Sequence, residues 1–311
     1  MYNLGLLSLF LYNVLTSAKG VYLGSFLQRV HPFLVLAVCF SMVTVFFALY
    51  NALFPGNNAS VRGVAKKHWR SILGLNISAL AGWTGFYFAL KLIEPAIVTS
   101  LTSALGPIIT AIYYSGVKRE RLFTRTEWTI FAGLFLIIAY LTVESYLGYS
   151  AVRKIPVDKV AVGILAALIC GIANVANTIL GKSLNNAGLK SRQVIPLRFF
   201  LLIFVGLWLC PSDQWSAISQ PSIQFSLFVI GLLGVAVPVL LFQIGIEKTN
   251  PFTVASVHAT IPIFVLAAQL FDDRLSLSAY SVVGAVSLAL LSLASLILNS
   301  SPQLAIKKAQ P

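Results

Sequence analysis

The sequence predicts an all-α integral membrane protein with ten transmembrane helices, arranged as two inverted repeats of five. Of its 311 residues, 58% are hydrophobic and 10% are charged, whereas a soluble domain has about 45–50% apolar and about 25% charged residues. Ten apolar runs, each near the length of roughly 20 residues that crosses a bilayer, are separated by short connections. Similar segments also recur in the two halves at a spacing of about 155 residues.

The ten runs are separated by turn or charge signals such as Pro55-Gly56-Asn57-Asn58 and Asp272-Asp273-Arg274. A transmembrane β-barrel would instead show strands of about ten residues with alternating hydrophobicity. Lipid leaves helices as the spanning structure for runs of this length. To within a few residues, the predicted helices cover 4–27, 32–54, 71–90, 96–115, 127–147, 160–181, 193–210, 223–246, 252–271 and 276–298.

The repeat is clearest in the fourth helix of each half. The segments Glu94–Pro107 and Asn250–Pro262 both begin with a proline after their first residue, continue through a polar Ser/Thr-rich stretch and reach a mid-helix proline. Because each half has an odd number of helices, the second half enters the membrane from the opposite side. We therefore expect one repeat in 1–150 and an inverted one in 151–311, which includes a short cytoplasmic tail. Inverted repeats are typical of secondary transporters.

The formal net charge of +13 follows the expected topology and does not indicate a nucleic-acid partner. Cytoplasmic connections of membrane proteins are rich in Lys and Arg. With a cytoplasmic N-terminus, 14 of the 22 basic residues fall in inside connections and 6 in outside ones. Both termini are then cytoplasmic. Lys19 and Arg198 are the two basic residues that this pattern does not place in connections.

The combination of these features resembles the drug/metabolite transporter superfamily, in its ten-helix EamA-type branch. The resemblance rests on the five-plus-five helices, the two proline-containing fourth helices and the turn Leu-Phe-Asp-Asp-Arg-Leu-Ser-Leu at Leu270–Leu277, and it extends over about residues 4–298. It implies a multi-pass protein of a cell membrane, the bacterial inner membrane, that transports a small organic metabolite by alternating access without a cofactor. The sequence departs from the family in its second helix, where Val38-Cys39-Phe40 stands at a position that is often arginine.

Two basic residues are the first candidates for substrate binding. Lys19 shares a helix face with Tyr12, Thr16 and Tyr22. A lysine at this depth is costly, so it either faces a cavity or extends to the outer surface. The guanidinium of Arg198 fits a carboxylate or a phosphate with two hydrogen bonds, or else it anchors the inner interface or ties helix ends together.

His258, near the middle of the ninth helix, is expected either to bind substrate or carry a proton, or to be a neutral imidazole bonded to a neighbouring helix. Its counterpart in the repeat is the Thr102-Ser103 pair. Asn174 and Asn177 form part of a polar stripe that either lines the path or packs against a neighbour. Trp83 and Tyr87, with Gln243 opposite Tyr87 in the repeat, form a possible stacking wall. The candidate substrate-binding residues are Lys19, Arg198, His258, Tyr12, Thr16, Tyr22, Trp83, Tyr87, Ser103, Asn174, Asn177 and Gln243.

All nine acidic residues lie at or near predicted helix ends, so we expect no buried carboxylate and an electropositive cavity. This favours a substrate with a carboxylate or a phosphate, such as an amino acid or an organic anion. Export of neutral or amphipathic compounds is the alternative. An intramembrane enzyme ranks third, since no His/Asp/Glu cluster or nucleophile motif is present.

We expect no metal site, and we expect Cys39, Cys170 and Cys210 to pack within helices. We also expect a monomer or weak homodimer whose partners are the lipid bilayer and a small molecule.

Overall fold

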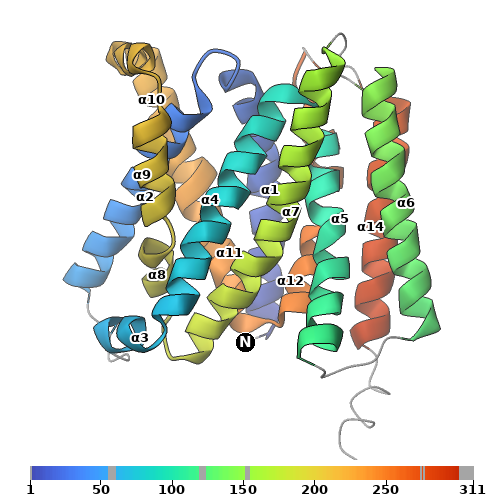
Figure 1. Ribbon diagram of the computed structural model, residues 1–311, viewed down its shortest axis with the longest axis horizontal. Helices are drawn as coiled ribbons and strands as arrows, with labels where there is room; N and C mark the ends of the chain where they lie inside the picture. Colours follow the sequence, from blue (N-terminus) through green and yellow to red (C-terminus); the bar gives the residue numbers. More distant parts are fainter. Residues whose placement is uncertain are drawn as a thin grey trace, which may run out of the picture.

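The computed structural model is a bundle of helices (Figure 1). It describes residues 2–54, 61–118, 124–150, 155–273, 275 and 277–300, without the side chains of 298–300. Ten helical segments in this part of the chain are long and apolar enough to cross a membrane. They coincide with the ten predicted runs, so the prediction of a multi-pass membrane protein is confirmed. The C-terminal tail with Lys307 and Lys308 lies outside the described residues.

The first five spans alternate in direction through the bundle. The N-terminus and the short helix α3 lie at the same end (Figure 1). Helix α5 continues into the π-helical turn η1 without a break. The elements are α1 (Tyr2–Phe26), α2 (Pro32–Leu53), α3 (Val61–Lys67), α4 (Trp69–Leu92), α5 (Pro95–Ile112), η1 (Tyr113–Val117) and α6 (Arg125–Leu147).

The second five spans are more irregular, and three of them consist of several pieces. Only the first and the last are single continuous helices. The elements are α7 (Val157–Asn186), α8 (Ser191–Val194), η2 (Ile195–Leu197), α9 (Phe200–Leu209), η3 (Ser212–Ser219), α10 (Pro221–Val229), η4 (Ile230–Ala236), α11 (Val237–Lys248), α12 (Pro251–His258), α13 (Ile261–Gln269) and α14 (Ala279–Ser300).

The helices pair across the two halves of the chain. Helix α1 packs along α11 and α13, while α7 packs along α4 and α5. Helices α2 and α9 contact each other at one edge of the bundle, and α6 and α14 contact each other at the opposite edge (Figure 1). Large apolar side chains such as Phe40, Tyr87 and Phe199 are fully buried between the helices. The interior lies around α1 and α7.

The matching prolines of the fourth and ninth spans have different effects. Pro107 lies inside the continuous helix α5, whereas Pro262 begins α13 just after a break that follows His258. A proline removes one helical hydrogen bond and leaves carbonyl groups to be satisfied by neighbours. Asn13 of α1 donates to Val257 O at 2.7 Å, and Ser17 donates to Ile261 O at 3.3 Å. Helix α1 therefore covers the break in the ninth span.

The seventh span has a similar break that the sequence did not predict. Pro196 lies in the 3₁₀ turn η2, and α9 begins only after Arg198. Asn76 of α4 donates to Leu197 O at 2.7 Å and accepts from the Leu201 N–H at 3.1 Å. An asparagine from a neighbouring helix thus satisfies the backbone at this break too.

Side-chain caps define several helix ends. Thr124 and Glu127 form a capping box at the start of α6, with the Glu127 N–H donating to Thr124 Oγ1 at 3.3 Å. At the start of α2, His31 Nδ1 accepts from the Phe33 N–H at 3.3 Å. Partial burial lowers the pKa of His31, and the nearby charge of Lys91 lowers it further. The cap thus favours the neutral imidazole.

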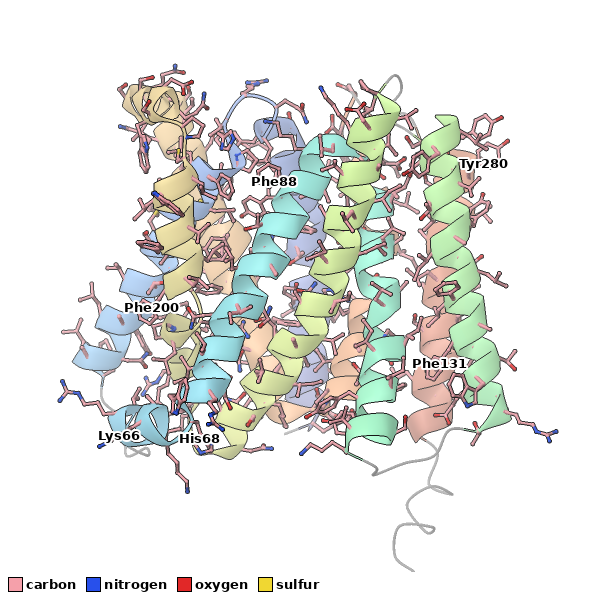
Figure 2. All side chains as sticks on the ribbon, viewed as in Figure 1. Lys66, His68, Phe88, Phe131, Phe200 and Tyr280 are labelled. Atoms are coloured by element: carbon pink, nitrogen blue, oxygen red, sulfur yellow. The ribbon has the colours of Figure 1, made fainter. Side chains whose placement is uncertain are left out.

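Figure 2 shows the two ends of the bundle. His68, just before α4, lies near Lys66 at one end, and Phe88 in the last turns of the same helix lies toward the other end (Figure 2). Tyr280 in the first turn of α14 lies at that second end as well (Figure 2). The side chains described next lie between these ends.

Candidate functional site

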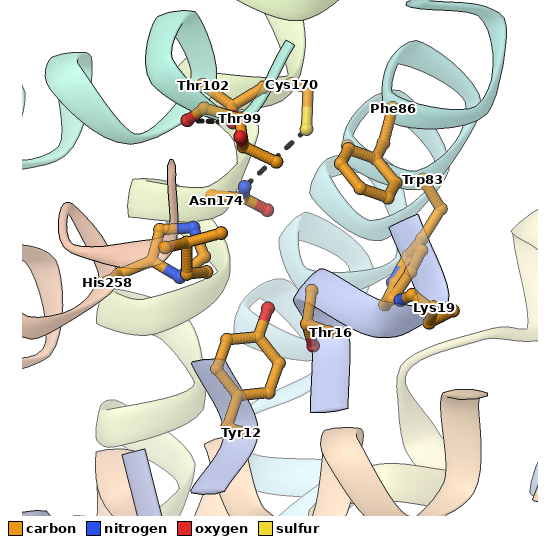
Figure 3. A pocket seen from close by; sticks show the side chains of 12 residues that line it. Tyr12, Thr16, Lys19, Trp83, Phe86, Thr99, Thr102, Cys170, Asn174 and His258 are labelled. Atoms are coloured by element: carbon orange, nitrogen blue, oxygen red, sulfur yellow. Dashed lines mark hydrogen bonds between the residues drawn. The ribbon is translucent and has the colours of Figure 1, made fainter. Parts of the chain in front are cut away.

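A cavity lies between α1, α4, α5, α7 and the broken ninth span (Figure 3). Its empty volume is about 410 Å³, which includes space open to the surroundings. Six of the twelve candidate residues line it, and the other six do not. The lining residues are Tyr12, Thr16, Lys19, Gly82, Trp83, Phe86, Thr99, Thr102, Cys170, Asn174, His258 and Ile261.

One face of α1 supplies Tyr12, Thr16 and Lys19, as predicted from their spacing. These positions lie within a narrow sector at about 100° per residue. Tyr22 was expected on the same face, but that placement is wrong. Its side chain is 49% exposed, and its hydroxyl donates to Ser226 Oγ at 3.1 Å. Tyr22 follows Tyr12 by ten residues, which places the two side chains roughly 80° apart around the helix axis.

Lys19 faces the cavity and does not extend to the outer surface. It is 6% exposed, and within the described part of the chain its Nζ has no hydrogen-bond partner. The Nζ lies 4.7 Å from the centre of the Trp83 ring and 5.5 Å from that of Phe86. The aliphatic stem packs on Gly234 of η4, where an added Cβ would come within 3.0 Å of Lys19 Cγ. Glycine at 234 therefore leaves room for the lysine.

His258 lies on the other side of the cavity from Lys19 (Figure 3). Its ring centre is 5.7 Å from that of Tyr12, in a stacked arrangement, and 5.8 Å from that of Phe242. Its Nδ1 is buried and has no hydrogen-bond partner among the described residues. Two aromatic rings thus hold the imidazole at the end of α12, beside the break in the ninth span.

A polar wall comes from α5 and α7. Thr102 Oγ1 donates to Thr99 O at 3.0 Å, and Asn174 Nδ2 donates to Cys170 Sγ at 3.5 Å (Figure 3). Ser103, one of the twelve candidates, is fully buried outside this wall and donates to Thr99 O at 2.6 Å. The lining residues that were not among the twelve candidates are Gly82, Phe86, Thr99, Thr102, Cys170 and Ile261. The Ser/Thr-rich stretch of this helix was visible, but its rotation was not.

Four further candidates lie outside the cavity. Tyr87 is fully buried against Phe40 and Trp83, and Asn177 accepts from Ser78 Oγ at 3.2 Å. The last two, Gln243 and Arg198, lie together deeper in the bundle.

Gln243 donates to Asn185 Oδ1 at 2.8 Å. Arg198 lies beside it, because an added Cβ at Gly181 would come within 3.4 Å of both side chains. Arg198 is 3% exposed, and its Nε and Nη2 have no partner among the described residues. Arg198 is thus a second buried basic residue, and it does not line the cavity around Lys19.

The expectation that no carboxylate is buried is wrong. Glu94, Glu127 and Glu144 are 0%, 2% and 3% exposed. They do occur at helix ends, but the ends of α5, α6 and α14 converge and enclose two of them. The cavity around Lys19 is different, since its lining residues in the described chain include neither Asp nor Glu. The described residues also contain no group of three or more His, Cys, Asp or Glu side chains able to hold a metal ion.

Comparisons with known proteins identify the fold but no family. No family model matches the chain, and no curated protein matches it. A solved structure described only as "Crystal structure of protein" superposes with a TM-score of 0.64 at 16% sequence identity. The alignment covers 94% of this chain and 96% of that chain. The two chains therefore share a fold over nearly their whole length.

Proposed function

We propose that the chain is a secondary transporter, not an enzyme, and that it moves a small organic molecule with a carboxylate or a phosphate across the membrane by alternating access. The ten spans place it in a membrane. The proposal extends this to a substrate site in the cavity around Lys19.

The unpartnered ammonium of Lys19 is the observation that carries the proposal. An isolated charge in a low-dielectric interior is costly unless an opposite charge or hydrogen-bond partners accompany it. Neither an acidic side chain nor a hydrogen-bond acceptor meets Lys19 Nζ within the described chain. A bound anion would supply both. Thr16, Asn174 and His258 line the same space and offer hydrogen-bonding groups to the rest of the substrate.

The aromatic side chains favour an organic substrate over an inorganic ion. Trp83, Phe86 and Tyr12 present ring surfaces to the cavity, and such rings stack well on apolar or planar groups. A neutral or amphipathic substrate for export would also use these rings, but it would leave Lys19 uncompensated. An organic anion would both compensate the charge of Lys19 and pack against the aromatic rings.

The pairing of helices supports alternating access between two inverted repeats. If α1 corresponds to α7, and α4 to α11, then the contact of α1 with α11 has its counterpart in the contact of α7 with α4. The contacts of α1 with α13 and of α7 with α5 correspond in the same way. In transporters of this kind the site lies where the repeats meet, often beside interrupted helices. The cavity lies beside the break that follows His258.

The resemblance to the EamA-type branch, the cytoplasmic termini, the bacterial inner membrane and a monomeric or weakly dimeric state are parts of the same proposal. The distribution of basic residues supports the orientation. The resemblance itself rests on the five-plus-five helices, the two proline-containing fourth helices and the turn at Leu270–Leu277.

A counterflow assay tests the function. Purified protein in liposomes is loaded with one unlabelled candidate at a time from a panel of amino acids, organic acids, organophosphates and matched neutral amides. Uptake of the same labelled compound is then measured. We expect transient accumulation with at least one anionic compound, reduced to the protein-free level by Lys19→Met and unchanged by Tyr22→Phe. Accumulation limited to neutral or cationic compounds would replace the anionic substrate with the export alternative, and equal accumulation in Lys19→Met would remove Lys19 from the site.

A further inference from the structure

A second polar site lies at the end of the bundle opposite to the N-terminus, where α5 and α14 begin and α6 ends (Figures 1 and 2). Glu94 is the N-cap residue of α5, Glu144 lies in the last turn of α6, and Ser281 lies in the first turn of α14. All three side chains are buried, with exposures of 0%, 3% and 1%. None of them lines the cavity around Lys19.

One hydroxyl joins the two carboxyl groups. Ser281 Oγ lies 2.9 Å from Glu94 Oε2 and 2.6 Å from Glu144 Oε1. A serine hydroxyl has a single proton, so it donates to only one of these oxygens. The second contact is a hydrogen bond only if the other carboxyl group is protonated and donates to Ser281. Two ionised carboxylates would also repel each other across the one hydroxyl in a buried environment.

We propose that Glu94, Ser281 and Glu144 form a proton-binding site that holds one proton between the two carboxyl groups at neutral pH. The proposal is independent of the transport function and of the substrate. The proton completes a chain from one carboxyl through Ser281 to the other, and so joins the ends of α5, α6 and α14.

One buried carboxyl oxygen without a partner supports a protonated, uncharged acid in this site. Glu144 Oε2 has no hydrogen-bond partner within the described residues. An ionised carboxylate accepts at both oxygens, whereas a protonated acid that donates from Oε1 needs fewer partners. Gln269 Oε1 is also buried without a partner there, although its Nε2 donates to Glu94 Oε1 at 3.3 Å. A proton on Glu144 removes the negative charge that an ionised carboxylate would share with its unpartnered Oε2.

Ser278 also contacts Glu144. Its Oγ lies 2.7 Å from Tyr149 O, which can only accept, and 3.1 Å from Glu144 Oε1. With its single proton given to Tyr149 O, Ser278 Oγ has none to donate to Glu144. Ser278 therefore does not stabilise an ionised Glu144, while the one proton of a protonated Glu144 goes to Ser281. In this arrangement Glu94 is the carboxyl group that accepts from Ser281.

Among the described residues, the ionisable groups near the pair include tyrosines and one acid. Tyr140 of α6 donates to Tyr280 O at 3.3 Å, and Tyr149 stacks on Tyr280 with ring centres 5.1 Å apart. Asp272 follows α13, which supplies Gln269. Arg274 lies outside the described residues. Tyrosines are uncharged at neutral pH.

A cavity at this end of the bundle is lined by sequence neighbours of the pair. Ile93 and Ser145, the sequence neighbours of Glu94 and Glu144, line a cavity of about 490 Å³ of unoccupied space. Gly148 and Ser150 also line it, in the segment that follows α6. Glu94, Glu144 and Ser281 do not line this cavity themselves.

Infrared spectroscopy of the full chain in lipid tests the site, because a protonated carboxylic acid has a carbonyl stretching band distinct from those of carboxylates. We expect the wild type at pH 7 to show this band, shifted by D₂O. Glu144→Gln should remove it, since the amide can donate to Ser281 while Ser281 donates to Glu94. Glu247→Gln is the matched control and should keep it, because Glu247 accepts from the N–H and the hydroxyl of Ser191 and from Lys248.

The same variants have a second, thermodynamic signature. If the folded state holds one proton that the unfolded state releases, the unfolding equilibrium constant rises up to about tenfold per pH unit from about pH 4.3, where an unfolded glutamate ionises, to the pH at which the folded site loses its proton. We expect Glu144→Gln to reduce that dependence and Glu247→Gln to retain it. Absence of the carbonyl band in folded wild type at pH 7 would overturn the proposal whether or not the variants fold. So would a band that persists in Glu144→Gln, or stabilisation by sodium at constant pH without a band.

Discussion

Replacing Lys19 by methionine should stabilise the protein while it removes anion binding. Lys19 is 6% exposed and its Nζ has no hydrogen-bond partner in the described structure. Methionine is flexible and apolar and of similar length, so it fills the same space between Trp83 and Gly234. If Lys19 serves function at the expense of stability, its replacement raises the free energy of unfolding and weakens anion binding.

The size of the effect follows from two opposing contributions. A lysine near the centre of a membrane helix costs about 2.5–3.5 kcal/mol on insertion scales. The contacts of Nζ with Trp83 at 4.7 Å and Phe86 at 5.5 Å return about 0.5–2 kcal/mol. The difference predicts that Lys19→Met raises the free energy of unfolding by about 0.5–3 kcal/mol.

Lys182→Met is the matched control, because Lys182 also lies within a span but has partners. Its Nζ donates to Glu247 O at 2.8 Å and to Thr249 O at 2.7 Å. Hydrogen bonds from a charged donor contribute about 1.5–3 kcal/mol in proteins and less in membranes. We expect Lys182→Met to lower the free energy of unfolding by about 1–3 kcal/mol.

Both variants are measured by equilibrium unfolding in the same lipid or detergent, in the absence of candidate substrates. Opposite signs for the two substitutions support an uncompensated lysine at 19 and a compensated one at 182. If Lys19→Met destabilises the protein as much as Lys182→Met does, the Lys19 ammonium has structural partners and the argument for an anion site fails.

Three further predictions follow. Tyr12→Phe should weaken substrate binding about 3–10-fold by removing one hydroxyl from the cavity, whereas Tyr22→Phe should leave the Kd unchanged; equal effects would contradict the placement of these side chains. Gly234→Val should reduce uptake and cost about 1–3 kcal/mol of stability, because its side chain meets the stem of Lys19; unchanged uptake would refute this contact. The pKa of His31 is lowered in the folded state. Its contribution to stability is therefore present above the unfolded pKa of about 6.5 and is lost as the pH falls below that value. His31→Asn should keep the helix cap and flatten this pH dependence, which thermal melts at acid and neutral pH measure.

The ten spans were predictable from the sequence because long apolar runs have few other structures available in lipid. The breaks within them were less so. Pro107 and Pro262 occupy matching positions in the fourth and ninth spans, yet of these two spans only the ninth is interrupted. The hydrogen bond from Asn13 that covers this break joins residues far apart in the chain, which a local pattern does not reveal.

The cavity was predictable in part. The spacing of Tyr12, Thr16 and Lys19 was enough to place them on one face. Ser103 was chosen where its neighbour Thr102 lines the cavity, since one residue on a helix changes direction by about 100°. Burial of carboxylates was mispredicted for a related reason. The position of a residue at a helix end does not show which other helix ends meet there. Glu144, for example, is enclosed by Ser278 just before α14 and by Ser281 in its first turn.

Equilibrium binding to the purified wild type and Lys19→Met tests most directly whether the cavity is an anion site. Each carboxylate or phosphate in the panel is paired with its uncharged amide or alcohol, and the Kd is obtained from the shift in the unfolding transition with ligand concentration. We expect at least one pair in which the wild type binds the anion about tenfold or more tightly than the neutral compound, with the preference lost in Lys19→Met. Binding of only the neutral members, or an anion with the same Kd for both proteins, would contradict an anion site at Lys19.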